Sequence, residues 1–189
     1  MSASAGRHLV VIGLRASGKT SAGRLAADRL GVAFCDLDDL AIQDIDGRVF
    51  PTVREAWAEA GEDSFRVAEV AALTSALTKP SDDVLALGGG TVAFAAARRV
   101  LTEAMDAGVV LGPVYVHAPP GVLADRLRRD LGDRPSITGE HPADEITGLY
   151  DRRDGIYRAM AEELVEVEHL TIDQAADRLV ELWHRLADR

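Results

Sequence analysis

A phosphate-binding pattern closes the first apolar run of the chain. Residues 13–20 read Gly-Leu-Arg-Ala-Ser-Gly-Lys-Thr and match G-x-x-x-x-G-K-[ST], in which glycines turn backbone N–H groups toward an anion. The lysine of this pattern reaches the β- and γ-phosphates of a nucleotide, and the last hydroxyl can bind Mg²⁺. A glycine-rich turn without a ligand is the alternative, but a strand-like run (His8–Ile12) precedes the pattern and a helical segment (Thr20–Leu30) follows it. The predicted nucleotide-binding residues are Gly13, Leu14, Arg15, Ala16, Ser17, Gly18, Lys19 and Thr20.

Carboxylates follow the second apolar run. Because ligands of open parallel sheets bind beyond the carboxyl ends of the strands, we expect Asp36 and Asp38 to project into a site. Asp36 could hold Mg²⁺ through water, and Asp38 could accept a proton from a substrate hydroxyl. The plainer alternative is that Asp38 or Asp39 caps the following helix, which would explain one of the three acids.

Three consecutive glycines, Gly88, Gly89 and Gly90, follow the third apolar run. Such a run is costly in conformational entropy, and a simple turn rarely needs more than one glycine. We therefore expect a ligand to lie against this bare backbone and to bond to its N–H groups. A flexible strand-to-helix turn remains the alternative.

Arginines are the remaining candidates for binding an anion. Arg66 lies three residues before Glu69 on a predicted helix, and spacing alone favours a solvated pair of little energetic value. If the pair were buried, Glu69 would instead hold the guanidinium in place for a carboxylate ligand. Arg152 and Arg153, taken alone, are typical of surface charges.

A polar, irregular segment interrupts the second half of the chain. Residues 130–144 contain two prolines and two glycines and show no periodicity. Long irregular segments inside compact domains are typically lids, binding loops or disorder, and we expect a mobile lid here. Arg134 in this segment could close over a phosphate in transfer and stabilise its charge.

The composition limits the classes of protein to which the chain can belong. Its 189 residues predict a single domain, 1–189, and its net charge of −10 argues against a nucleic-acid partner. No apolar stretch approaches the ~20 residues that cross a membrane, so we expect no membrane association. Cys35 is the single cysteine and cannot form an internal disulfide, which favours a reducing, cytoplasmic setting.

Apolar runs alternate with helical patterns along the whole chain, which predicts a parallel α/β architecture. Capping boxes with Thr52 and Thr171 as N-caps predict the starts of two helices. The expected strands are His8–Ile12, Val32–Cys35, Val84–Leu87, Val114–His117 and Leu164–Val167.

Together these motifs resemble those of the shikimate kinases, from about His8 to Trp183. Their order is the phosphate loop, Asp-x-Asp, Gly-Glu-x-x-Phe-Arg-x-x-Glu, Gly-Gly-Gly, Arg-Pro in the lid, and Arg-x-x-x-Tyr. The resemblance implies a three-layer P-loop kinase fold, with a five-stranded parallel sheet flanked by helices and a mobile lid. It also implies an ATP-dependent enzyme, cytoplasmic and monomeric, that phosphorylates the 3-hydroxyl of shikimate.

The resemblance further implies a role for each candidate residue. The segment 8–30 and Arg134 would bind ATP, with Mg²⁺ on Thr20 and Asp36, and the segment 36–78 would belong to the acceptor side. The implied catalytic residues are Lys19, Asp38 and Arg134. The implied shikimate-binding residues are Asp38, Arg66, Glu69, Gly88, Gly89, Gly90 and Arg153, and Arg128 and Arg129 fall where the family packs an arginine on adenine.

The chain departs from the family pattern at three places. Ala16 stands where a glycine is usual, which costs about 1 kcal/mol or more if that position requires a positive φ. Ser136-Ile137 replaces Leu-Leu in the lid, and Gly155-Ile156 replaces Pro-Leu before Tyr157. None of these changes removes a charge that the chemistry needs. Two other functions stay open: a gluconate-type kinase, and a regulatory module that binds nucleotide without turnover.

Overall fold

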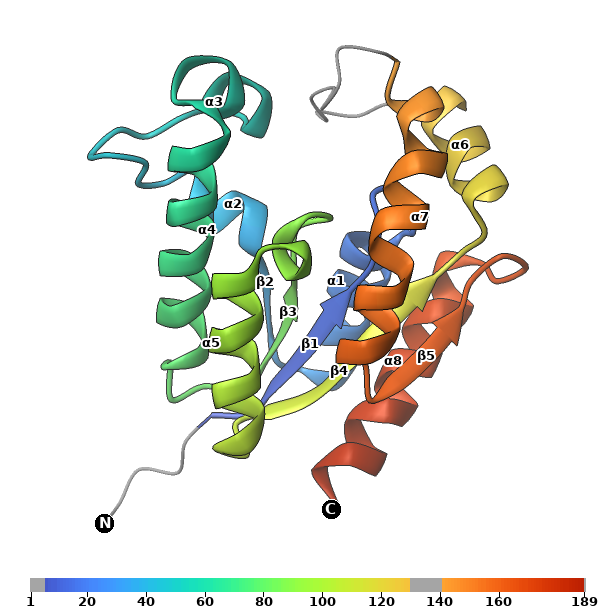
Figure 1. The fold of residues 1–189 in the computed structure, drawn as a ribbon. Coiled ribbons are helices and arrows are strands. Elements are labelled where there is room, and N and C mark those ends of the chain that lie inside the picture. Colours follow the sequence, from blue (N-terminus) through green and yellow to red (C-terminus); the bar gives the residue numbers. More distant parts are fainter. Residues whose placement is uncertain (1–5, 130–140, 189) are drawn as a thin grey trace.

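A five-stranded parallel sheet forms the centre of the computed structural model, which describes residues 6–129 and 141–188 (Figure 1). The strand order is β2-β3-β1-β4-β5, and all neighbouring strands are parallel, as the alternating sequence pattern predicts. The strands are β1 (His8–Ile12), β2 (Ala33–Asp36), β3 (Asp83–Ala86), β4 (Val110–His117) and β5 (Glu163–Glu166).

Helices cover both faces of this sheet, so the molecule has three layers. Helices α1 and α8 pack against each other behind the sheet, and α5 and α7 lie in front of it (Figure 1). The helices are α1 (Lys19–Leu30), α2 (Leu37–Ala41), α3 (Val53–Glu59), α4 (Gly61–Leu77), α5 (Ala95–Asp106), α6 (Pro120–Arg129), α7 (Pro142–Met160) and α8 (Ile172–Ala187), with a 3-10 turn η1 (Thr91–Ala93). The expected three-layer α/β fold is confirmed.

The fourth strand begins four residues earlier than expected, whereas the other strands differ from expectation by at most one residue at each end. The expected strand started at Val114, but β4 begins at Val110 and is buried along its length. Gly112 has a positive φ of 91° and the register against β1 shifts at this point, so a bulge lets the strand pass the Gly-Pro pair.

The register of the sheet sets the place of the site. Val11 of β1 and Asp36 of β2 both lie opposite Ala86 of β3. Consequently the phosphate loop, the Asp36–Asp38 segment and the three glycines leave neighbouring strands at the same edge. This edge is where ligands of open parallel sheets bind.

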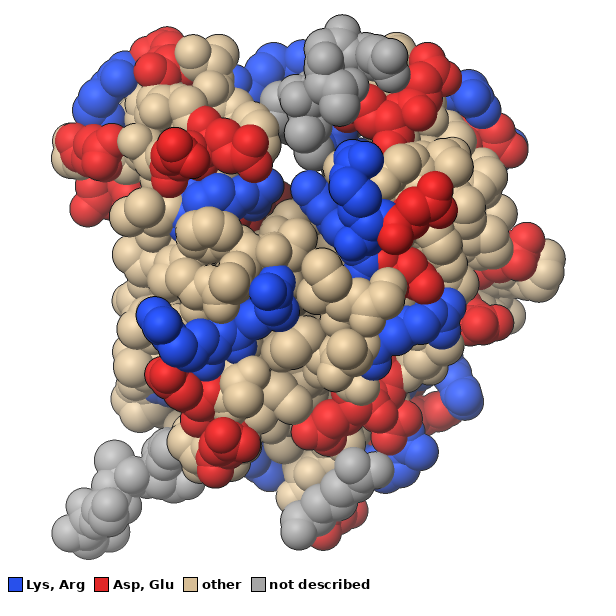
Figure 2. Space-filling model, in the orientation of Figure 1, with Lys and Arg blue, Asp and Glu red and all other residues tan. Residues whose placement is uncertain are grey.

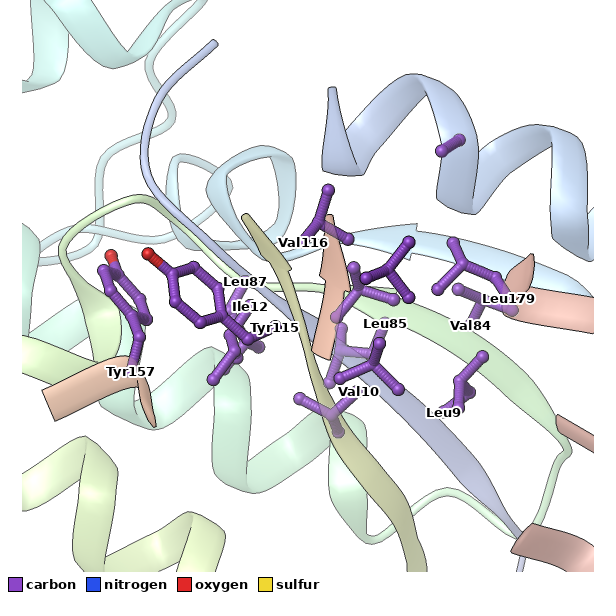
Figure 3. Packing of buried hydrophobic residues seen from close by; sticks show 14 of the residues in the cluster. Leu9, Val10, Ile12, Val84, Leu85, Leu87, Tyr115, Val116, Tyr157 and Leu179 are labelled. Carbon is purple, nitrogen blue, oxygen red and sulfur yellow. The ribbon is translucent and has the colours of Figure 1, made fainter. Parts of the chain in front are cut away.

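Two apolar clusters stabilise this arrangement. The larger one surrounds the sheet, where all of β1 is buried and the rings of Tyr115 and Tyr157 stack with centroids 5.0 Å apart (Figure 3). The smaller one lies among α2, α3 and α4 and includes Ile45, Phe50 and Phe65. It gives the segment around α3 and α4 a core of its own, beside the edge that carries the site.

The two helix starts predicted from capping residues are found in the structure. Thr171 and Gln174 form the predicted capping box before α8, and the Thr52 side chain accepts a hydrogen bond from the N–H of Glu55 before α3.

The expected lid, residues 130–144, ends too late by three residues, because α7 already begins at Pro142. Residues 130–140, which include Arg134 and Ser136-Ile137, lie outside the described part. Across the described residues, helices long and apolar enough to span a bilayer are absent.

Candidate active site

The phosphate loop is curled as its sequence predicts. It joins β1 to α1, and Gly18 caps the helix in the left-handed region with a φ of 89°. Lys19 follows at the first position of α1, where its side chain is largely buried. The free N–H groups and the dipole at the start of this helix favour an anion, which agrees with a phosphate site.

Ala16, which stands where the family usually has a glycine, does adopt a positive φ. Its φ is 64°, and the N–H of Ser17 donates to the carbonyl oxygen of Leu14 (3.2 Å), which makes Ala16 the third residue of a tight turn. Turns with a positive φ at the third residue favour glycine. An L-residue there costs about 1–2 kcal/mol, so the loop carries strain that a glycine would avoid.

Thr20 and Asp36 meet at the start of α1, where both were expected as metal ligands. The hydroxyl of Thr20 donates to Asp36 Oδ2 at 2.9 Å. A hydroxyl and a carboxylate are oxygen donors of the kind that Mg²⁺ prefers, and Mg²⁺ usually combines one or two such groups with substrate phosphates. This pair therefore fits an ion that travels with a nucleotide.

The helix cap falls on a different acid from the one expected. Asp36, and not Asp38 or Asp39, is the N-cap of α2, and its Oδ1 accepts from the N–H of Asp38 at 3.1 Å. This bond fixes the backbone that carries Asp38. Desolvation raises the pKa of the Asp38 carboxyl to about 7, and the charges of Glu69 and then Asp36 add to the increase. Asp38 therefore titrates close to neutral pH, as a general base should.

Arg66 and Glu69 form a buried pair, so the solvated pair favoured by spacing alone is wrong. Arg66 is 9% exposed and Glu69 is 1% exposed. Arg66 Nη1 donates to Glu69 Oε2 (2.5 Å), while the hydroxyl of Thr91 donates to Glu69 Oε1 (2.5 Å). Both carboxylate oxygens are thus engaged, and the guanidinium is held in one orientation.

The glycines give space to side chains of the site, which adds a reason for them beyond the ligand contact expected. A Cβ on Gly88 would lie 2.7 Å from Glu69 Oε1 and would also collide with the Asp38 carboxylate. A Cβ on Gly90 would lie 2.5 Å from Arg66 Nη2. At two of the three positions, the absence of a side chain therefore has a reason beyond the flexibility of a turn.

Arg153 is half-buried and lies against the three glycines, so it is not a typical surface charge. Its Nη1 and the hydroxyl of Tyr157 both donate to the carbonyl oxygen of Gly89, each at 2.7 Å. Burial lowers the pKa of Arg153, and the positive charges of Arg66 and Arg152 lower it further. The positive charges of Arg66 and Arg153 therefore repel each other. An anion bound to both guanidinium groups would offset this repulsion.

The distribution of charge agrees with such a site. Figure 2 shows Lys and Arg side chains on both sides of the hollow between the α3–α4 segment and α7, while acidic side chains cover outer surfaces around it. A protein with a net charge of −10 thus gathers cations locally where its candidate ligands are anions.

Two arginine contacts escaped the sequence reasoning. Arg15 of the phosphate loop pairs with Glu145 of α7 (3.6 Å), and Arg126 of α6 donates to backbone carbonyls of the same loop. No motif marks Glu145 or Arg126. Arg128 and Arg129, which fall where the family packs an arginine on adenine, are both exposed, and Arg128 pairs with Asp125.

Comparison with known proteins places the chain in one family. The family model described as shikimate kinase matches residues 15–183. The shikimate kinase of Oleidesulfovibrio alaskensis is 39% identical over 163 residues, which cover 84% of this chain and 87% of that protein. The solved structure of shikimate kinase from Acinetobacter baumannii in complex with shikimate has a TM-score of 0.78 at 28% identity, covering 95% of this chain and 94% of that one.

A solved gluconokinase from Sinorhizobium meliloti has a TM-score of 0.67 at 20% identity, covering 97% of this chain and 94% of that one. At this identity the likeness concerns the fold alone. The family model and the relatives instead match the sequence that surrounds the site, and the chain belongs to the shikimate kinase family.

Proposed function

We propose that this protein transfers the γ-phosphoryl group of ATP to the 3-hydroxyl of shikimate, giving shikimate 3-phosphate and ADP. The observation that carries the proposal is the pair of guanidinium groups of Arg66 and Arg153, which meet the adjacent Gly90 and Gly89, with the desolvated Asp38 carboxyl next to Gly88. A small acceptor with a carboxylate at one side and a hydroxyl at the other matches these three groups. The phosphate loop follows β1, which β3 separates from β2, and it leaves the sheet at the same edge as the Asp36–Asp38 segment.

In this proposal the acceptor side holds and orients its substrate. Arg66, fixed by Glu69, and Arg153, fixed on the Gly89 carbonyl, bind the carboxylate through charge-assisted hydrogen bonds. The hydroxyl faces Asp38, which takes its proton as the hydroxyl oxygen forms a bond to the γ-phosphorus, while the bond from that phosphorus to the bridging oxygen breaks and ADP leaves. Gly88, Gly89 and Gly90 leave room for the shikimate ring, which packs against their backbone.

The donor side binds the triphosphate. Residues 13–20 surround the phosphates with backbone N–H groups, and Lys19 adds a cation where negative charge moves during the transfer. Thr20 and Asp36 would hold Mg²⁺, which, when bound, neutralises phosphate charge. Arg134, which lies outside the described residues, would complete the charge stabilisation. Phosphoryl transfer needs mostly positioning and electrostatics, and both are what these residues supply.

The test is an assay that couples ADP release to a visible readout, with shikimate, with gluconate and without an acceptor. We expect Mg²⁺-dependent turnover with shikimate alone. Equal rates with and without shikimate would defeat the assignment, and turnover with gluconate would favour a gluconate-type kinase. Tight nucleotide binding without any turnover would favour the regulatory module.

We further propose that the protein works as a monomer in the cytoplasm. A single polypeptide holds both sides of the candidate site, because Arg66, Arg153 and the phosphate loop belong to one chain. Light scattering behind a size-exclusion column measures the mass directly, and we expect it to match the chain mass of 20.2 kDa.

A further inference from the structure

Arg126 connects the phosphate loop to the segment that follows β5, the outermost strand of the sheet. Its Nη1 lies 3.3 Å from the carbonyl oxygens of both Ala16 and Ser17, and its Nη2 donates to the carbonyl oxygen of Val167 at 2.8 Å. Val167 follows β5, and its own N–H donates to the carbonyl oxygen of His117 at the end of β4 (2.8 Å). One guanidinium therefore joins a tight turn to a segment that the sheet holds in place.

The turn that Arg126 reaches is the strained one. Ala16 has a φ of 64°, in the region that L-residues avoid, and Ser17 is the residue that follows it. Without an external restraint, an alanine here gains by leaving this region, whereas a glycine adopts it without steric cost. The two carbonyl contacts from Arg126 fall on these same two residues.

The planar guanidinium suits this task. It offers several N–H donors in a fixed fork, so it can bond to carbonyls of two segments at once. Arg126 is half-buried on α6, a helix that packs against α7. The position of the guanidinium is therefore set by the fold.

We propose that Arg126 is a positioning residue that holds the Ala16–Ser17 turn in its phosphate-binding conformation. In this role it replaces the conformational freedom that a glycine would give at position 16. The inference rests on the proposed function in one respect, namely that residues 13–20 bind the phosphates of a nucleotide.

The test is a double-mutant cycle between the two positions. The dissociation constants of ADP and of inorganic tripolyphosphate are measured by calorimetry for the wild type, Ala16→Gly, Arg126→Met and the double variant. We expect Arg126→Met to weaken both ligands about tenfold or more in the wild-type background, and less than about threefold in the Ala16→Gly background. A loss of tenfold corresponds to about 1.4 kcal/mol. We also expect the dissociation constant of shikimate to stay unchanged.

Tripolyphosphate separates this role from a contact with the base. If Arg126→Met weakens ADP but leaves tripolyphosphate unchanged, Arg126 acts on the nucleoside and the proposal is overturned. The same loss in the wild-type and Ala16→Gly backgrounds also overturns it, because the effect then does not pass through the strained turn. Unchanged binding of both ligands in Arg126→Met has the same consequence.

Matched variants complete the experiment. Arg178→Met removes an exposed arginine of α8 that pairs with Glu181 and should change neither dissociation constant. If Arg126→Met does not fold, Arg126→Lys enters the same cycle, since one ammonium cannot reproduce the planar fork. If the wild type itself binds neither ADP nor tripolyphosphate, the proposed function fails, whereas failure of the inference appears only in the comparison of variants.

Discussion

Gly88 lies so close to the carboxylate of Asp38 that a methyl group on its Cα would overlap one of the carboxylate oxygens. The glycine is therefore part of the geometry that lets the proposed base approach the backbone after β3. Packing at this point joins α2 to the loop after β3, fifty residues further along the chain, and it explains why a glycine stands at position 88, which turn preferences alone leave open.

This contact predicts the effect of Gly88→Ala. The added methyl group must displace Asp38 or Glu69, and a displacement of about 1 Å can reduce catalysis about 10²-fold. We expect kcat/KM for shikimate to fall by about this factor while the dissociation constant of ADP stays within twofold. Gly121→Ala, at an exposed position of α6 with open space around the Cβ, is the control and should leave both values unchanged. Wild-type activity in Gly88→Ala would contradict the arrangement.

Asp38→Asn keeps the size of the side chain and removes the proton acceptor. General-base catalysis contributes about 10²–10⁴-fold to rates, and we expect kcat to fall by a factor in this range. The dissociation constants of ADP and shikimate should change little, because Lys19, Arg66 and Arg153 remain in place. Steady-state kinetics with calorimetry separates the two quantities. A kcat within threefold of wild type would exclude Asp38 as the base.

The same substitution should stabilise the protein when neither metal nor substrate is present. The pKa of Asp38 is about 7 in the folded state and near 3.8 in the unfolded chain, so ionisation favours unfolding. The neutral Asp38 carboxyl makes its full contribution to the free energy of unfolding below about pH 4, and this contribution is lost as the pH rises through about 7. An asparagine side chain does not ionise, and the Tm of Asp38→Asn should therefore exceed that of wild type increasingly from about pH 4 to about pH 8. Thermal scans in EDTA measure this difference, and a constant difference across the range would contradict it.

The sequence predicted the sheet, its parallel strands and the loop motifs, because each depends on local patterns. The spacing of apolar residues predicts helices and strands, and the glycines mark the loops between them. In a parallel sheet the carboxyl ends of the strands all lie at one edge, so the loops that carry the motifs come together there. Strand ends were less certain. The bulge at Gly112 hides the start of β4, and Asp36 takes the cap because β2 ends one residue later than the expected strand.

The contacts between side chains could not be predicted from spacing. An arginine and a glutamate three residues apart look alike whether the helix face is exposed or covered. The Arg66–Glu69 pair is buried because Gly90 and Thr91 lie against it, and these residues come from another segment. Arg126 was not predicted for a similar reason. Helix α6 carries three arginines close together, and the way in which the helix packs decides which of them faces the phosphate loop.

Glu69→Gln tests whether this buried pair orients Arg66. The amide keeps a hydrogen-bond acceptor for Thr91 but removes the charge that holds the guanidinium. We expect KM for shikimate to rise about tenfold or more, with KM for ATP within twofold. Glu62→Gln is the matched control, because Glu62 lies 3.5 Å from the same guanidinium and is half-exposed. Equal effects of the two substitutions would indicate a general loss of negative charge and not a loss of orientation.

The buried pair of His8 and Asp83 should contribute to stability without touching catalysis. These residues lie opposite each other in β1 and β3, at the end of the sheet away from the site, and His8 Nδ1 is 2.9 Å from Asp83 Oδ1. Asp83→Asn removes a charge-assisted bond at a position closed to water, and we expect it to lower the free energy of unfolding by about 1–3 kcal/mol. The neighbouring Asp82 pairs with Arg7 on the surface, so Asp82→Asn should cost less than about 1 kcal/mol. Urea unfolding measures both values, and kcat/KM should stay within twofold in each variant. A larger loss in Asp82→Asn than in Asp83→Asn would show that burial does not set the strength of these pairs.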